Sequence, residues 1–454
     1  MTSVSGVEAR RAAFFVLQEQ AATGAFLKDL FGPGLRDLRE DDAALARAIC
    51  FGVLRMQRLL DYNLEAHAPR GIKGTKLRMA LRIGACQLLF LSGIPAFAAV
   101  NTTVELVKRE VGRAESGFAN AVLKALAREG LRVPPGHDVR SLAVRHSHPE
   151  WLVRRWGKEL KPQALEAALR RNNEEAPLWV RANPRRGVPA ALPARMAEDG
   201  VILEPHPGLP LFFRLVEGTG AALRSEAFAA GLFSFQDPVS AWVVALLDWR
   251  PGLSLFDACS APGGKSALVL ETALGPSVEP AALVDAARLV CGDVSVARLR
   301  RLGDVRDRLG HGGLMPVCLD VAQAPFRRAT FDRILVDAPC SNLGVLRRRP
   351  EARWHWTPER ITALAERQRA LLEGAAALLV PGGRLVYATC SAEREETRDV
   401  VRDFLAAHPE FRLVPADGTV PAELCREGCL RVWPGETVYD GFFAAALERV
   451  EADG

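Results

Sequence analysis

The sequence predicts an α/β protein whose C-terminal half, residues 231–450, is a doubly wound and mostly parallel sheet. Strand and helix patterns alternate from Leu253 onward, and this alternation is typical of the class. Residues 1–132 show only amphipathic helical patterns and are expected to form an all-α domain. Residues 140–230 mix short helical and strand patterns and are expected to form a small α+β segment.

The helices of the all-α domain are predicted from apolar residues that recur every three or four positions. Asp41 or Asp42 is placed to cap a long helix, and Thr75 opens a second one that ends before the Gly-Ile-Pro at residues 93–95. Further helices are expected over residues 100–111 and 116–128.

The Pro/Gly-rich stretch at residues 130–137 is predicted to be a linker. The α+β segment that follows should hold helices at residues 149–160 and 163–173, and strands at residues 177–182, 201–203 and 211–215. Residues 233–237 then lead into another helix.

Six strands and a late pair are expected in the C-terminal half, at residues 253–257, 288–292, 315–319, 332–336, 384–389, 411–414, 430–433 and 441–447. The helix at residues 357–379 is clearly marked, because Thr357 can cap it, Pro358 suits its first position, and two glycines at 382–383 follow its end. In such sheets, ligands bind at the carboxyl ends of the strands.

The composition excludes several classes of protein. The chain has 454 residues, of which 49% are hydrophobic and 25% are charged, as in a soluble globular protein. No apolar run approaches the roughly 20 residues of a membrane span, and the first residues lack the layout of a secretory signal. The nine cysteines have no paired spacing, so we expect reduced thiols, a cytoplasmic location and no metal site.

Positive charge is concentrated in two regions. Residues 1–130 hold 18 Lys and Arg against 13 Asp and Glu, and residues 140–190 hold 11 against 5. Clustered positive charge suits a polyanion such as nucleic acid, although basic residues are equally common on solvated helix surfaces.

The segment Leu-Phe-Asp-Ala-Cys-Ser-Ala-Pro-Gly-Gly-Lys-Ser at residues 255–266 is predicted to be a strand, a turn of small residues and the start of a helix. Glycines let backbone N–H groups approach a ligand, and a helix N-terminus carries positive partial charge. The segment is not a phosphate-binding P-loop, because Cys259 stands where that loop requires glycine.

Acidic residues follow successive predicted strands. Asp257, Asp293, Asp320 and Asp337 occupy these ends, and they should face one crevice. Asp293 is placed to bind ribose hydroxyls and Asp320 to reach an adenine amino group. For a single aspartate, a turn or helix-capping role is equally common.

Two cysteines also follow strands, Cys340 after the fourth and Cys390 after the fifth. If these strands neighbour the first one, both thiols lie beside the turn of small residues, where a cysteine is a candidate nucleophile. A redox disulfide is the alternative, but no Cys-x-x-Cys motif occurs. Among the other cysteines, inert core positions are expected for Cys50, Cys86, Cys291 and Cys318.

Three motifs resemble the S-adenosylmethionine-dependent RNA cytosine-5 methyltransferases of the NOL1/NOP2/Sun family. They are Asp-Ala-Cys-Ser-Ala-Pro-Gly-Gly-Lys (257–265), Asp-Ala-Pro-Cys-Ser (337–341) and Ala-Thr-Cys-Ser (388–391). The match continues through Arg-Arg-Arg-Pro (347–350), Trp354 and Asp-Gly-Phe-Phe (440–443). One departure is Arg-Glu-Glu-Thr at 394–397, where the family usually has Pro-Glu-Glu-Asn; it concerns a loop contact rather than the nucleophile.

The resemblance implies a Rossmann-like methyltransferase domain that binds S-adenosylmethionine. It implies Cys390 as the nucleophile toward C6 of cytosine, Cys340 as the group that assists elimination, and Asp337 as the residue that binds the base. The residues implied for the cofactor are Cys259, Ser260, Ala261, Pro262, Gly263, Gly264, Lys265, Asp293, Asp320 and Asp337.

The N-terminal third resembles the RNA-binding NusB domain, and this fusion is the layout of a bacterial methyltransferase of 16S ribosomal RNA. The resemblance therefore implies a looped or flipped cytosine in 16S ribosomal RNA as the target, no membrane partner, and a monomer. The same chemistry on a transfer RNA or another RNA, and a non-catalytic RNA-binding assembly factor, are the alternatives. The presence of both Cys340 and Cys390 argues against the non-catalytic role, and a DNA enzyme is disfavoured because DNA enzymes lack the second thiol.

Overall fold

The computed structural model describes residues 6–273 and 289–451 of the chain. The chain divides into two compact units, the first made of Met1–Glu175 with Leu346–Trp356 and the second of Ala176–Val345 with Thr357–Gly454. Within the described ranges, no helix has the length and apolar character that crossing a membrane requires.

The first unit is helical, as predicted for residues 1–132, but it also extends through Glu175, into residues that the prediction placed in the α+β segment. One core joins its first six helices. Asp41 and Asp42 do not cap α3, because this helix already begins at Glu40 and both aspartates lie in its first turn. The helices of this unit are α1 (Val7–Thr23), α2 (Leu27–Gly34), α3 (Glu40–Glu65), α4 (Thr75–Phe90), α5 (Ala96–Glu110), α6 (Arg113–Glu129), α7 (Val139–Arg145), α8 (Glu150–Glu159), α9 (Pro162–Arg171) and α17 (Ala352–His355).

The segment Leu346–Trp356 belongs to this first unit, although Cys340, a few residues before it in the sequence, belongs to the second unit. Arg353 is fully buried, and its guanidinium donates to the Ser147 carbonyl at 2.9 Å and to Asn173 Oδ1 at 2.8 Å. Trp354 donates its indole N–H to the Leu54 carbonyl at 2.7 Å. Burial and the neighbouring Arg55 lower the pKa of Arg353 to about 9, so these acceptors offset the cost of a buried charge.

A four-stranded antiparallel sheet of order β2-β3-β1-β4 opens the second unit. Its strands are β1 (Leu178–Ala182), β2 (Ile202–Pro205), β3 (Phe212–Glu217) and β4 (Phe233–Phe235). The first three match predicted strands, whereas β4 lies in a stretch that was expected only to lead into a helix. Three residues carry too little alternation to mark a strand, and pairing with β1 defines it. The short helices here are α10 (Leu192–Ala197), α11 (Thr219–Arg224) and α12 (Glu226–Ala229).

The larger sheet of the second unit has the order β11-β12-β13-β9-β8-β5-β6-β7, with β10 paired to β13. Pairing is parallel from β9 through β8, β5 and β6 to β7. The predicted doubly wound sheet is therefore confirmed, and β8 lies between β5 and β9 as the cysteine argument requires. The strands are β5 (Leu255–Asp257), β6 (Leu289–Asp293), β7 (Leu314–Cys318), β8 (Phe331–Asp337), β9 (Leu379–Thr389), β10 (Phe411–Val414), β11 (Cys425–Arg426), β12 (Cys429–Val432) and β13 (Phe442–Arg449).

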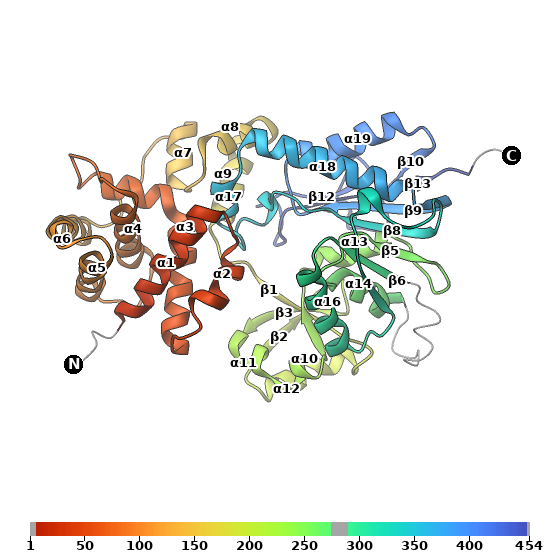
Figure 1. Ribbon diagram of the computed structural model, residues 1–454, viewed down its shortest axis with the longest axis horizontal. Coiled ribbons are helices and arrows are strands. Elements are labelled where there is room, and N and C mark those ends of the chain that lie inside the picture. The colour runs from red at the N-terminus through yellow and green to blue at the C-terminus, as the bar shows by residue number, and fades with distance from the viewer. Residues whose placement is uncertain (1–5, 274–288, 452–454) are drawn as a thin grey trace. The chain divides into compact units, whose positions relative to one another are not determined.

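Alternating strand residues divide this sheet between two cores. On β9, Val386 and Ala388 pack with one core, while Leu385 and Tyr387 pack with the other. The first core contains residues of α13 (Val239–Leu246), α14 (Gly264–Ala273) and α16 (Val296–Leu309), and the second contains residues of α18 (Pro358–Ala376) and α19 (Arg398–Ala407). Helices thus cover both faces of the sheet (Figure 1).

Two predicted strand starts differ from the structure or lie outside the described residues. The strand β9 begins at Leu379 rather than at residue 384, so the two glycines at 382–383 lie inside it and not in a loop after α18. Gly382 has a φ of +74°, and the pairing register between β8 and β9 shifts here. Arg288, the first residue of the strand predicted at 288–292, lies outside the described residues.

Candidate active site

The carboxyl ends of β5, β8 and β9 bring three of the predicted residues to one edge of the sheet. The parallel register places Asp257 opposite Leu335 and Asp337 opposite Ala388, two residues before Cys390. The strand order reverses at β5, since β6 lies on one side of it and β8 on the other. Such a reversal is where doubly wound sheets bind their ligands.

The two cysteine thiols lie against each other. The distance between Cys340 Sγ and Cys390 Sγ is 3.0 Å, and Cys390 Sγ also lies 3.3 Å from Asn342 Oδ1. The contact with Cys390 and burial both raise the pKa of Cys340 well above its ordinary value. Cys340 is therefore held as a neutral thiol.

Lys265 and Asp337 form an ion pair beside these thiols, with 2.6 Å between Lys265 Nζ and Asp337 Oδ2. Burial opposes the charge of Lys265, but Asp337, Cys390 and Asp257 together raise its pKa above the ordinary value. The ammonium also lies 5.2 Å from the centroid of the Phe442 ring. This lysine is a fixed positive charge at the site.

Backbone contacts shape the loop from Cys259 to Gly264. The Ser260 N–H donates to the Gly292 carbonyl at 2.9 Å, and Gly263 has a φ of +99°, which favours glycine. A side chain at Gly292 would come within 2.9 Å of the Phe256 ring. The α14 helix begins at Gly264, so its first N–H groups face this loop.

Asp257 is buried at the base of this loop, where its Oδ2 accepts from the Ser266 hydroxyl at 2.5 Å. Burial raises the pKa of Asp257 to about 7, more than the hydrogen bond from Ser266 lowers it. Its second oxygen, Oδ1, is buried and has no hydrogen-bond partner in the described part of the chain.

Asp293 and Asp320 differ in their surroundings. Asp293 is buried, with Oδ1 accepting from the Ser295 N–H at 2.9 Å and Oδ2 in an ion pair with Arg298 at 3.0 Å. Asp320 is exposed and accepts from the Ala322 N–H at 3.0 Å, which caps the short 3-10 helix η2 (Val321–Gln323).

These residues fit a nucleoside cofactor with a charged amino-acid tail. Buried carboxylate oxygens of Asp257 and Asp293 lack full hydrogen bonding within the described part of the chain, so each can accept a further hydrogen bond from a ligand. Across residues 6–273 and 289–451, no group of three or more His, Cys, Asp or Glu side chains could hold a metal ion.

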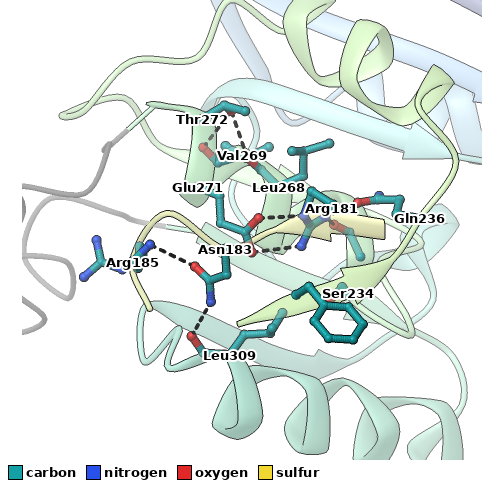
Figure 2. A network of polar contacts seen from close by, with 12 residues as sticks. Arg181, Asn183, Arg185, Ser234, Gln236, Leu268, Val269, Glu271, Thr272 and Leu309 are labelled. Atoms are coloured by element: carbon teal, nitrogen blue, oxygen red, sulfur yellow. Dashed lines mark hydrogen bonds and ion pairs between the residues drawn. The ribbon is translucent and has the colours of Figure 1, made fainter. Parts of the chain in front are cut away.

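Figure 2 shows a network of polar contacts around Arg181 and Glu271, which the sequence did not reveal. Arg181 on β1 is buried, pairs with Glu271 of α14 at 2.6 Å, and donates to the Gly264 carbonyl at 2.9 Å. His311 also contacts Glu271, at 2.9 Å, and Gln236 accepts from Arg181. The small sheet therefore holds the first turn of α14 through one arginine.

A close approach of two glycines accounts for Gly441 in the motif at residues 440–443. Any side chain on Gly344 would come within 2.4 Å of the Gly441 carbonyl oxygen. The two backbones are joined, because the Gly441 N–H donates to the Gly344 carbonyl at 2.8 Å and the Gly344 N–H donates to the Cys390 carbonyl at 3.1 Å. This contact ties the Cys340 loop to the Cys390 loop.

Among the cysteines expected in the core, Cys318 is an exception. Cys50, Cys86 and Cys291 are buried, but Cys318 at the end of β7 is exposed. The strand β7 lies at the edge of the larger sheet, and Met315 on it is likewise exposed. An apolar strand pattern does not distinguish such a sheet edge from the centre.

Three family models match the chain. Residues 244–448 match the model described as 16S rRNA methyltransferase RsmB/F, residues 7–128 match the NusB family, and residues 148–220 match the ferredoxin-like domain of the RsmF/B-like methyltransferases.

Curated relatives match over nearly the full length. Ribosomal RNA small subunit methyltransferase B of Vibrio cholerae is 34% identical over 97% of each chain, and that of Xanthomonas campestris pv. campestris is 35% identical over 98% of each. Among solved structures, PH0851 is 26% identical with a TM-score of 0.79 over 99% of both chains. A methyltransferase homolog from Pyrococcus horikoshii, 24% identical, has a TM-score of 0.58 over 69% of this chain and 99% of its own.

The raised pKa of Asp257 predicts a pH-dependent stability. Between about pH 4 and pH 7 the folded protein holds a proton that the unfolded chain releases, so stability is lost as the pH rises through 7. Relative to Asp257→Asn, the wild type should lose about 1.4 kcal/mol of unfolding free energy per pH unit over this window.

Urea unfolding of both proteins between pH 5 and pH 8 measures this difference. Asp403→Asn removes a partly exposed carboxyl from α19 and keeps Asp257, so this control should lose unfolding free energy with pH as the wild type does. Parallel curves for the wild type and Asp257→Asn would show that Asp257 is not protonated in the folded state.

Proposed function

The chain belongs to the RsmB/F family of 16S rRNA methyltransferases, and on this basis we propose that it methylates C5 of a cytosine in small-subunit ribosomal RNA through a covalent bond between Cys390 and C6. The observation that carries the proposal is the 3.0 Å contact between Cys340 Sγ and Cys390 Sγ, beside the ion pair of Lys265 and Asp337.

The cofactor of this reaction is S-adenosylmethionine, which supplies an electrophilic methyl group. We assign its methionine end to the loop from Cys259 to Lys265, where small residues and backbone N–H groups leave room for it. Asp293 is assigned to the ribose hydroxyls and Asp320 to the adenine amino group. Because Asp320 is exposed and also caps η2, its contribution to binding should be smaller than that of Asp293.

Cys390 activates the base. Its thiol loses a proton, and the sulfur electron pair forms a bond to C6 while the electrons of the C5–C6 double bond move onto the ring. C5 becomes nucleophilic only after this addition, and this is why the reaction needs a thiolate. The bound cofactor would supply the methyl group, its S–CH3 bond breaking as the bond to C5 forms. The C5 proton then passes to solvent, its C–H electron pair restores the C5–C6 double bond, and the S–C6 bond breaks, which returns the electron pair to Cys390.

Asp337 and Lys265 are assigned to stabilise the charge that develops on the base. Asp337 is assigned to the exocyclic amine and to N3 in its protonated form, from both of which a carboxylate can accept, and the ammonium of Lys265 fixes the position of that carboxylate. A preorganised charge in a water-poor site stabilises a transition state at no further cost of reorganisation. Cys340, kept as a neutral thiol by burial and by Cys390, is assigned to help eliminate the enzyme from the product.

The N-terminal NusB-like region is assigned to RNA docking. A base within a stacked helix is unreachable, so the target cytosine must lie in a loop or be flipped out, and other surfaces must recognise its surroundings. Arg70, Lys73 and Lys76 are exposed within seven residues of one another around the start of α4. We place the activity in the cytoplasm and expect a monomer.

Replacing Cys390 and replacing Cys340 should block different steps of the reaction. Cys390→Ala should abolish methylation of 16S ribosomal RNA while leaving S-adenosylmethionine binding intact, because Cys390 acts on the base alone. Cys340→Ala should leave a protein–RNA adduct that survives a denaturing gel, because elimination is blocked. Methylation is measured by bisulfite sequencing of the RNA.

The opposite pattern, with an adduct in Cys390→Ala and none in Cys340→Ala, would exchange the two roles. Turnover by Cys390→Ala comparable to wild type would exclude covalent catalysis. Full activity on transfer RNA with none on 16S ribosomal RNA would retain the chemistry and change the substrate.

Asp293→Ala should weaken S-adenosylmethionine binding by about tenfold to a hundredfold, since hydrogen bonds to a charged acceptor contribute about 1.5–3 kcal/mol. Asp293→Asn keeps an acceptor for the Ser295 N–H and should show nearly the same loss if the charge serves the ribose. Asp304→Ala, on the exposed side of α16, is the control for calorimetry. Wild-type affinity in Asp293→Asn would reduce Asp293 to a turn-capping role.

Replacing Arg70, Lys73 and Lys76 together by Gln should weaken RNA binding and reduce the slope of log affinity against log salt by about 2 to 3, because each phosphate that is no longer neutralised lowers the slope by about 0.7–0.9. The matched control replaces Arg195, Arg402 and Arg412, each paired with a carboxylate in the structure. An equal slope in the wild type and the first variant would exclude this surface from RNA docking.

A further inference from the structure

The buried carboxylate of Glu396 touches the residue that follows each of the two cysteines. Glu396 has no exposed surface. Its Oε1 accepts from the Ser341 N–H at 2.8 Å, and its Oε2 accepts from the hydroxyl groups of Ser341 and, at 2.5 Å, Ser391. Ser341 follows Cys340, and Ser391 follows Cys390.

Further contacts hold Glu396 itself in place. Gln368 of α18 donates to Glu396 Oε1 at 3.1 Å and, from the same amide nitrogen, to the Pro339 carbonyl at 2.9 Å. The buried Tyr387 hydroxyl donates to the backbone carbonyl of Glu396 at 2.7 Å. The carboxylate therefore accepts four hydrogen bonds from groups on two loops and one helix.

These contacts constrain the peptide groups on which both thiols depend. The bond from the Ser341 N–H fixes the peptide that joins Ser341 to Cys340. The Ser391 hydroxyl accepts from the Glu393 N–H at 3.1 Å while it donates to Glu396, so the turn after Cys390 closes on the same carboxylate. Thr397 completes this turn by donating to the Glu393 carbonyl at 2.8 Å, which is the loop contact made where the family usually has Asn.

We propose that Glu396 is a positioning residue that sets the distance between the Cys340 and Cys390 thiols by holding Ser341 and Ser391. The proposal rests on the proposed function for its catalytic meaning, because the two thiols must act in turn on one base. The position of the thiols is also a property of the protein alone, and it can be measured without RNA.

The charge of Glu396 and its hydrogen bonds should have opposite effects on the reactivity of the two thiols. After the contact with Cys390 and burial, Glu396 is among the groups that raise the pKa of Cys340. If Glu396 acted only through its charge, its neutralisation would favour thiolate formation and speed thiol reactions. If it acts by positioning, neutralisation would separate the thiols and slow any reaction between them.

Disulfide formation between Cys340 and Cys390 distinguishes these cases. Diamide removes two electrons and two protons from the pair and is reduced to the hydrazine, and the sulfurs need to approach by only about 1 Å to reach bonding distance. The rate is followed by mass spectrometry of the Cys340–Cys390 peptide pair in the full chain. Glu396→Gln should slow this reaction about tenfold.

Two serine variants and one control accompany Glu396→Gln. The Ser341→Ala and Ser391→Ala variants keep the carboxylate and the bond from the backbone N–H of residue 341 but remove both hydroxyl donors, and combined they should also slow the reaction, even if Glu396→Gln fails to fold. Glu395→Gln changes the neighbouring carboxyl of the same turn and should react as the wild type does. Unchanged or faster disulfide formation in both Glu396→Gln and the double serine variant would overturn the proposal.

Methylation supplies the second measurement. Glu396→Gln should lower kcat about a hundredfold, as expected for a small misplacement of reacting groups, with the KM for S-adenosylmethionine unchanged. A parallel rise in KM would indicate general damage to the site and contradict a positioning role. Slowed disulfide formation in a chain whose wild type methylates no RNA would retain the positioning role and reject the proposed function.

Discussion

The parallel pairing of β5, β8 and β9 is the constraint on which the site depends. Hydrogen bonds between these strands fix the register, so Asp337 lies opposite Ala388 and the thiol of Cys390 emerges beside that of Cys340. A shift of one residue along β9 would turn Tyr387 and Ala388 to the opposite faces of the sheet, so that each side chain would point toward the other core. The same ladder that buries the apolar side chains therefore also aligns the reactive groups.

The buried charged side chains of this site are stabilised in different ways. Lys265 and Asp337 neutralise each other, and Arg181 and Glu271 form a second pair whose desolvation is offset by contacts with Gly264 and His311. Glu396 is balanced by four neutral donors. Asp257 accepts from the Ser266 hydroxyl, while its Oδ1 has no hydrogen-bond partner among the residues that the structure describes, and burial raises its pKa to about 7. Each of these carboxyl groups is thus held in place by partners or kept close to neutral.

Local patterns were sufficient to predict the strand ends, the glycine loop and both cysteines, because each strand end is followed by a distinct polar motif. They could not predict contacts between distant segments. Arg181 lies in a five-residue strand with no sign that it reaches α14, and Leu346–Trp356 joins a helical unit more than 170 residues before it in the chain. The early start of β9 was missed because glycines usually end an element, while here tertiary pairing continues through them.

The segment Leu346–Trp356 connects the Cys340 loop to the helical unit through the chain itself. Arg353 and Trp354 hold this segment within the helical unit, while Gly344, two residues before the segment begins, is bonded to the Cys390 and Gly441 backbones in the second unit. The Cys340 loop is thus anchored at one end by Glu396 and Gly441 and continues at the other into the NusB-like unit.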